Sequence, residues 1–254
     1  LFSFGTTPVW GQFPSVTPEE VGLSPERLAR VSEAFQGYAD DGRIAGAVGL
    51  VARHGKLAWA EAWGMRDLAA GDPMEVDDIF RIFSMTKPIT SVAVMMLWEE
   101  GHFRLDDRIG RYLPELGNMV VADLERSTGP DDIVTVPAER QITIRDLLRH
   151  TAGLSYGLTF GRTAADQAFA RVNPTGQATL AEMVTELGKL PLARQPGNGW
   201  RYSAATDVLG RLVEVVSGQA FDVFLRDRIF EPLSMDDTAF FVPDSKRNRF
   251  TQLY

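Results

Sequence analysis

The first eighty residues show a helical hydrophobic pattern followed by a strand-like one. Ser24-Pro25-Glu26 has the composition of a helix start, with a cap, a first-position proline and an acidic first turn. The next apolar residues recur at helical spacing, at Leu28, Val31, Phe35 and Tyr38. This spacing predicts a helix with one buried face. Two apolar runs, AGAVGLVAR and KLAWAEAW, then flank His54-Gly55 and predict a β-hairpin around a glycine-containing turn.

The middle of the chain is mainly helical in pattern. SMTKPITSVAVMMLWEEG, from Ser84 to Gly101, is apolar enough to predict a helix buried on most sides and ended by the glycine. Thr143 and Asp146 have the spacing of a capping box, which predicts a short helix. Further helices are expected near 180–188, 204–216 and 220–230. Loops are expected over 117–140, a polar region without an immediate helix signal over 155–178, and a strand at TAFFVP, 238–243.

This order of elements predicts an α+β fold. We expect an N-terminal arm over 1–20 and the first part of an α/β domain over 21–80. A mostly helical domain is expected over 81–218. The chain should then return to the α/β domain over 219–254, with an incomplete sheet.

Composition excludes several functional classes. Hydrophobic residues make up 44% and charged residues 24% of the 254 positions, which is typical of a folded globular protein. The net charge of -8 and the absence of a basic stripe argue against a nucleic-acid partner. No apolar stretch approaches the roughly 18 residues that span a bilayer. Because a removed signal peptide would leave the same start, the compartment stays open between cytoplasm, which we favour, and periplasm or secretion.

Cysteine and histidine usage gives no indication of a metal or a cofactor. The chain has no cysteine, so thiolate chemistry and disulfides are absent. Its three histidines, His54, His102 and His150, are scattered without the spacing of metal ligands. We therefore expect neither a metal site nor a cofactor.

Two serines compete as the candidate nucleophile of a hydrolase. Gly153-Leu154-Ser155-Tyr156-Gly157 matches GxSxG, the nucleophile elbow of α/β-hydrolases. That elbow needs a strand before the serine, a helix after it and a histidine downstream. Here a capped helix precedes Ser155, no immediate helix signal follows it, and no histidine occurs after His150. We therefore predict that Ser155 lies in a turn and is not the nucleophile.

Ser84 is the stronger candidate because Lys87 follows it by three residues at the start of the apolar helix. Three residues of an α-helix turn the chain by about 300° and advance it by about 4.5 Å, so the lysine lies nearly above the serine. A neutral lysine there could take the hydroxyl proton, and the helix N-terminus favours negative charge nearby. The alternative is a simple helix cap, since SxxK also occurs by chance.

Three segments in this order resemble the serine β-lactamase-like superfamily: FSMTKPITSVAVMMLWEEGHFRLDD, ITIRDLLRHTAGL and GWRYSAATDVLGRLVEVVSG. Within it the sequence is most similar to family VIII carboxylesterases, relatives of class C β-lactamases and DD-peptidases. The resemblance covers most of residues 20 to 240. It implies an antiparallel sheet flanked by helices, together with a mostly helical domain.

The resemblance also implies a role for each motif residue. Ser84 would attack an ester carbonyl and form an acyl-enzyme, with Lys87 and Tyr202 as its proton-transfer pair. Whether the lysine or the tyrosine is the base stays open, because strongly coupled groups titrate as a unit. His150, in HTAGL, would pack and form hydrogen bonds rather than act as a base.

Three aromatic residues are candidates for the walls of the acyl pocket: Tyr156, Phe160 and Trp200. Two features depart from the family pattern. Ala204 stands where class C β-lactamases have an asparagine, which favours an esterase over a β-lactamase. No KTG, HxG or WGG element follows Tyr202, so we expect a further segment of the same protein to complete the sheet and the oxyanion hole.

The expected function is hydrolysis of short-chain esters, with a small-molecule ester as the partner. Within the same fold, a β-lactamase, a DD-peptidase or an acyltransferase remains an alternative. From another class, a non-catalytic binding relative remains open.

Overall fold

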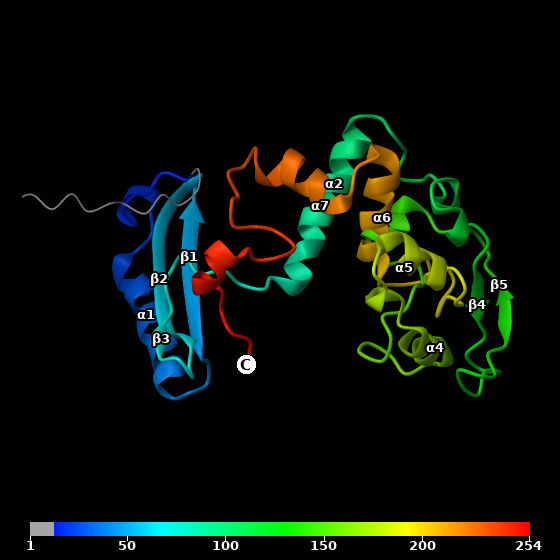
Figure 1. Ribbon diagram of the computed structural model, residues 1–254, viewed down its shortest axis with the longest axis horizontal. Coiled ribbons are helices and arrows are strands. Elements are labelled where there is room, and N and C mark those ends of the chain that lie inside the picture. Colours follow the sequence, from blue (N-terminus) through cyan, green and yellow to red (C-terminus); the bar gives the residue numbers. More distant parts are fainter. Residues whose placement is uncertain (1–12) are drawn as a thin grey trace, which may run out of the picture. The chain divides into compact units, whose positions relative to one another are not determined.

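The computed structural model describes residues 13–254, so most of the expected N-terminal arm lies outside the described residues. The chain divides into two units. The first comprises the residues up to Phe83 together with Phe230–Tyr254, and the second comprises Ser84–Ile229 (Figure 1). The first unit contains a three-stranded antiparallel sheet and the second is mostly helical.

The first unit begins with the predicted helix and hairpin. Helix α1, Pro25–Asp40, is capped by Ser24, whose hydroxyl accepts a hydrogen bond from a backbone N–H of the first turn. Strands β1, Gly46–Arg53, and β2, Lys56–Asp67, pair antiparallel, and the short β3, Asp72–Pro73, extends the sheet beside β2. Both residues of the β1–β2 turn have a positive φ, 54° at position 54 and 69° at position 55. This is the geometry that matches the twist of a tight hairpin, so both predictions are confirmed.

Helix α1 packs along β2, and Figure 1 shows it on one face of the hairpin. The contact is aromatic: the ring of Phe35 stacks on that of Trp63, with centroids 4.9 Å apart. Trp63 is buried, but no residue of α1 is, and Tyr38 is 37% exposed. The buried face predicted for this helix is therefore only half-buried, because its main contact is with a single strand.

The C-terminal residues return to the first unit. Backbone hydrogen bonds join Ile79 to Arg249 and to Thr251, at 2.7 and 3.0 Å. A 3₁₀ helix, Asp244–Arg249, precedes this pairing. The strand predicted at 238–243 is wrong: the segment bends, and its two phenylalanines are 56% and 72% exposed. A β-strand needs a neighbour to complete its hydrogen bonds, and this segment pairs with no described strand.

The second unit is built on two packed helices. Helix α2, Thr86–Glu99, lies against α6, Ala205–Ser217 (Figure 1). Both helices contain buried apolar residues: Ala93, Val94, Leu97, Val208, Leu209, Leu212 and Val213. Gly218 ends α6 with a φ of 73°, a left-handed conformation that favours glycine. Val92 and Trp98 are 51% and 43% exposed, so α2 buries one face and the expectation of burial on most sides is wrong.

Shorter elements surround this pair: η3 Ile109–Arg111, η4 Pro114–Leu116, α3 Ile144–Leu148, η5 Pro174–Gly176, α5 Leu180–Leu187 and α7 Phe221–Leu225, which continues as a π-helix, Arg226–Phe230. The helices predicted near 180–188, 204–216 and 220–230 are thereby confirmed. The stretch 117–140 is not all loop, since β4, Val120–Ala122, pairs with β5, Thr135–Pro137. Helix α4, Ala164–Val172, was not predicted, although Thr163 and Asp166 form a capping box at its start.

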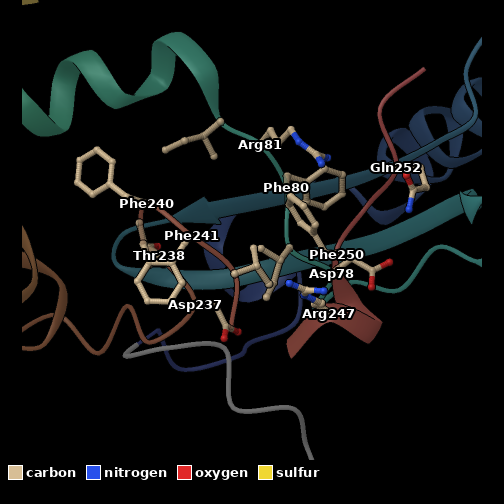
Figure 2. Close-up of a pocket in the computed structure, with 14 residues that line it drawn as sticks. Asp78, Phe80, Arg81, Asp237, Thr238, Phe240, Phe241, Arg247, Phe250 and Gln252 are labelled. Atoms are coloured by element: carbon tan, nitrogen blue, oxygen red, sulfur yellow. The ribbon is translucent and has the colours of Figure 1, made fainter. Parts of the chain in front are cut away.

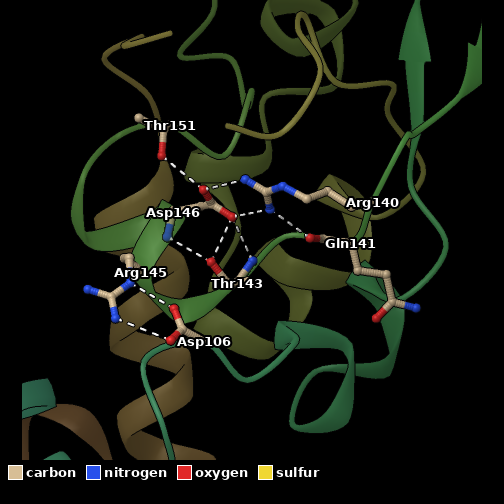
Figure 3. A network of polar contacts seen from close by, with 7 residues as sticks. All are labelled: Asp106, Arg140, Gln141, Thr143, Arg145, Asp146 and Thr151. Atoms are coloured by element: carbon tan, nitrogen blue, oxygen red, sulfur yellow. Dashed lines mark hydrogen bonds and ion pairs between the residues drawn. The ribbon is translucent and has the colours of Figure 1, made fainter. Parts of the chain in front are cut away.

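A buried carboxylate caps α3 and joins it to the preceding loop (Figure 3). Asp146 accepts hydrogen bonds from the Arg140 guanidinium at 2.6 and 2.9 Å and from Thr143 and Thr151. Burial alone would raise the pKa of Asp146, but the hydrogen bonds from Arg140 and Thr143 lower it from 3.8 to about 2. The capping box predicted from the sequence is confirmed and is part of a larger network.

Asp146→Ala is expected to reduce the free energy of unfolding at pH 7 by roughly 3 kcal/mol, because it removes a cap and takes the carboxylate from the Arg140 guanidinium. The folded pKa of Asp146 is depressed, so its contribution is present above pH 3.8 and is lost as the pH falls toward about 2. Denaturant unfolding at pH 7 and at pH 2.5 measures both effects.

Asp106→Ala is the matched control, since it also removes a carboxylate from an arginine pair in the same region (Figure 3). The Asp106 and Arg145 side chains are 69% and 47% exposed, and an exposed ion pair contributes little. A loss for Asp106→Ala equal to that for Asp146→Ala would contradict the assignment of stability to the buried network.

Candidate active site

Ser84 lies in a 3₁₀ turn, Phe83–Met85, that leads directly into α2. The preceding Phe83 has a φ of 43°, a left-handed conformation that is strained for a bulky side chain. Ser84 is exposed, and Lys87 Nζ donates to its Oγ at 3.4 Å. The structure therefore places the lysine over the serine hydroxyl, at the spacing that the sequence predicts.

Tyr202 comes to the same point from the irregular segment that precedes α6. Its Oη lies 2.7 Å from Ser84 Oγ, although the two residues are 118 positions apart. The packing of α2 on α6 brings them together. The SxxK pair, Ser84 and Lys87, and the distant Tyr202 therefore form one contact group.

The Lys87 ammonium favours the ionised form of the Tyr202 phenol. Burial opposes this, but hydrogen bonds from Lys87 and Ser84 hold the pKa of Tyr202 below its ordinary value. Lys87 Nζ also lies 4.8 Å from the centre of the Tyr202 ring, within the range of a cation–π interaction. The serine hydroxyl thus faces an oxygen that can accept its proton.

Two further ionisable groups are near Lys87: Tyr156, a predicted pocket residue, and Asp207, which was not predicted as a site residue. Burial raises the pKa of Asp207, although the positive charge of Lys87 acts to lower it. Burial also raises the pKa of Tyr156, with the Asp207 carboxylate adding to the effect. Lys87 Nζ lies 5.8 Å from the Tyr156 ring centre. The available signal for Asp207 was its place in the first turn of an amphipathic helix that begins three residues after Tyr202.

The three predicted pocket residues are grouped around Tyr202. The ring centroids of Phe160, Tyr156 and Trp200 lie 4.6, 5.5 and 6.3 Å from that of Tyr202. Phe160 and Trp200 are 53% and 65% exposed. Aromatic surface that is open to solvent beside the serine hydroxyl is suited to an apolar acyl group.

His150 lies flat against Tyr202, with ring centroids 4.9 Å apart and an interplanar angle of 14°. Its Nδ1 is 3.4 Å from the Ser203 hydroxyl. Burial lowers the pKa of His150, and the charge of Lys87 lowers it further. A neutral imidazole stacked on the phenol matches the expected packing and hydrogen-bonding role.

Ser155 occupies a different environment. It is buried, and its hydroxyl donates to Asp166 Oδ1 at 2.5 Å while accepting from the Gly157 N–H at 3.1 Å. The short helix α3 precedes it, and α4 begins only at Ala164. The strand, serine and helix order of a nucleophile elbow is absent from this part of the chain.

The first unit carries a separate cavity of about 870 Å³ (Figure 2). It is lined by segments 78–82, 237–242 and residues 247, 250 and 252, and it contains none of the predicted site residues. Its carboxylates are held in ion pairs, Asp78 with Arg66 and Asp237 with Arg249, each at 2.8 Å. The lining thus lacks the contact between a nucleophile and a proton acceptor that marks the Ser84 group.

Two negative findings apply to residues 13–254. No cluster of three or more histidine, aspartate or glutamate side chains is arranged to hold a metal ion. No helix in this range is both long and apolar enough to cross a membrane.

Comparison with known proteins gives consistent matches. An uncharacterized protein of Mycobacterium tuberculosis is 40% identical over 215 residues, which cover 85% of this chain and 52% of the relative. Esterase EstB of Burkholderia gladioli is 34% identical over 239 residues, covering 92% of this chain and 57% of EstB. The chain thus spans about half the length of the curated relatives it matches.

Among solved structures, EstCE1, described as a hydrolase with promiscuous acyltransferase activity, matches with a TM-score of 0.73 and 31% identity. The match covers 88% of this chain and 55% of EstCE1. The sequence model of the Beta-lactamase family matches residues 31–254. The chain therefore belongs to the Beta-lactamase family and has the α+β fold of β-lactamases and penicillin-binding proteins.

Proposed function

We propose that the protein is a serine carboxylesterase that cleaves short-chain esters through an acyl-enzyme on Ser84. The observation that carries the proposal is the contact group itself: Ser84 Oγ lies within 2.7 Å of Tyr202 Oη and 3.4 Å of Lys87 Nζ. A serine acts as a nucleophile only when a neighbouring group takes its proton. Similarity to an esterase and to a hydrolase supports the same reaction class.

The reaction would proceed in two halves. Ser84 Oγ bonds to the ester carbonyl carbon while its proton passes to the Tyr202 oxygen, which the Lys87 charge helps to ionise. The tetrahedral intermediate collapses, the bond from carbon to alkoxide breaks, and the proton goes from Tyr202 to the departing alcohol. Water then attacks the acyl carbon and gives its proton to the Tyr202 oxygen. The bond from this carbon to Ser84 Oγ breaks, and the proton returns from Tyr202 to Oγ, which releases the acid and restores the serine hydroxyl.

Acyl transfer to an alcohol is the second candidate, because EstCE1 has promiscuous acyltransferase activity. The two reactions share the acyl-enzyme and differ only in the molecule that attacks it. A β-lactamase is less favoured, since Ala204 is fully buried and offers no side-chain amide to a lactam. We also propose that a segment outside this chain completes the oxyanion hole, because the curated relatives are about twice as long.

The test is covalent trapping with a fluorophosphonate, followed by peptide mass spectrometry. We expect one phosphonyl adduct, on the peptide that contains Ser84. An adduct on Ser155 would overturn the assignment of Ser84 as the nucleophile. No adduct on the folded protein would overturn the proposal and leave the non-catalytic binding relative.

A substrate panel separates the reactions of this fold. We expect hydrolysis of p-nitrophenyl acetate and butyrate at least about 100-fold faster than hydrolysis of a chromogenic cephalosporin, a selectivity of about 2.7 kcal/mol in activation free energy. Adding a primary alcohol measures partitioning of the acyl-enzyme to transfer. A kcat/KM higher on the cephalosporin than on the p-nitrophenyl esters would contradict the esterase proposal and favour a β-lactamase.

A further inference from the structure

A buried ionic group joins the loop after α3 to the segment that carries Tyr202. Asp166, whose side chain is fully buried, accepts from Ser155 Oγ and from Arg201 Nη2, both at 2.5 Å. The Arg201 side chain is only 13% exposed, and its Nε has no partner in the described chain. We call Ser155, Asp166 and Arg201 the Asp166 cluster. A buried guanidinium of this kind is costly unless a carboxylate holds it.

The two carboxylate oxygens of Asp166 accept hydrogen bonds from different parts of the structure. Oδ1 accepts from Ser155 and Arg201, whereas Oδ2 accepts from the backbone N–H and hydroxyl of Thr163 and caps α4. Burial opposes ionisation, but the hydrogen bonds from Ser155 and Arg201 hold the pKa of Asp166 below its ordinary value. The carboxylate is therefore charged at neutral pH and acts on two parts of the structure.

Tyr202 lies between two residues, Arg201 and Ala204, that form hydrogen bonds with members of the Asp166 cluster or with the loop beside it. On one side, the Arg201 N–H donates to the His150 carbonyl at 2.8 Å and its side chain to Asp166. On the other, the Ala204 N–H donates to the Ser155 carbonyl at 3.1 Å. Residues 201–203 form no helix or strand, so these contacts hold the tyrosine in place together with the rings that pack on it, His150 above all.

We propose that Asp166 is a positioning residue for the reaction, acting through Arg201 and Ser155 to hold the Tyr202 hydroxyl against Ser84. The same cluster fixes Tyr156, which follows Ser155 directly and meets the Tyr202 ring edge-on. The GxSxG segment, 153–157, thus contributes to the site through the Ser155 side chain, which connects this segment to Asp166 and is not a nucleophile. This inference rests on the proposed function, because it concerns the proton acceptor of Ser84.

The test compares Asp166→Asn, Ser155→Ala and Thr163→Ala by the second-order rate constant for phosphonylation of Ser84. Displacing Tyr202 should slow labelling of Asp166→Asn by roughly 10- to 100-fold. Ser155→Ala, which removes one hydrogen bond of the cluster, should slow it by about fivefold. Thr163→Ala removes the helix cap and the hydroxyl hydrogen bond to Asp166 Oδ2, but it leaves Oδ1 with Ser155 and Arg201. Its unfolding temperature should therefore fall by a few degrees, while labelling stays within about twofold of wild type.

The pH profile of labelling distinguishes positioning from a loss of stability. Where Tyr202 loses its contact with Lys87, its pKa returns toward the ordinary value, and the pH at which labelling accelerates should move upward. Wild-type rates and pH profiles in Ser155→Ala and Asp166→Asn would overturn the inference, as would equal slowing in Thr163→Ala. If Asp166→Asn does not fold, Ser155→Ala decides. Absence of wild-type labelling at Ser84 would instead refute the proposed function.

Discussion

Replacing Ser84 by alanine is expected to reduce ester turnover by roughly 10⁴-fold or more, because no acyl-enzyme can form without its Oγ. Lys87 and Tyr202 would remain in place but would have no hydroxyl to activate. Ser84 is exposed and lies ahead of α2, so the unfolding temperature should stay within about 2 °C of wild type. Initial rates with p-nitrophenyl butyrate, together with a thermal unfolding curve, measure both quantities.

Ser155→Ala is the matched control, since it removes the hydroxyl of the competing motif. Its hydroxyl is buried against Asp166, so we expect a loss of no more than about tenfold in turnover, together with a lower unfolding temperature. Abolished turnover in Ser155→Ala with near-normal turnover in Ser84→Ala would refute the choice between the two serines.

Local signals account for the parts of the fold that the sequence predicts well. Ser24 caps α1, and the tight turn at 54–55 joins β1 to β2. Both features could be predicted because they depend on residues adjacent in sequence. The segment 238–243 shows the opposite case. Its β-rich composition predicts a strand, but strand formation also requires a partner, and composition contains no information about pairing.

Helix α4 was missed for a different reason. Its capping box, Thr163 and Asp166, is visible in the sequence, but the helix is short and follows a glycine-containing loop. A short helix is stabilised mainly by its packing, which a local pattern does not reveal.

The residues of the candidate site also differ in whether local sequence predicts their contacts. Ser84 and Lys87 are three residues apart on one helix start, so helical geometry alone brings them together. Tyr202 could be placed only through the family resemblance, because its contact with Ser84 depends on the packing of α2 against α6. Asp207 and the Asp166 cluster escaped prediction for this reason as well: each is defined by distant contacts.

Replacing Tyr202 by phenylalanine is expected to lower kcat/KM for p-nitrophenyl butyrate by roughly 10²- to 10⁴-fold, the range of a lost general base. The variant loses the oxygen 2.7 Å from Ser84 Oγ but keeps the ring that stacks on His150. Its fold should therefore be retained. The pKa of Tyr202 is held below its ordinary value, so the wild-type rate should rise with pH and level off below about pH 10. That rise should be absent from the variant.

Tyr112→Phe tests whether any tyrosine hydroxyl of the helical unit would have the same effect. The Tyr112 hydroxyl donates to Asp107 at 2.8 Å, and burial followed by this hydrogen bond raises its pKa. It makes no contact with the Ser84 group, so its removal should leave kcat/KM within about twofold of wild type and the pH profile unchanged. A Tyr202→Phe variant with wild-type kcat/KM and pH profile would remove the phenol from the mechanism and leave Lys87 as the sole proton acceptor, because no other group donates to or accepts from Ser84 Oγ among the described hydrogen bonds.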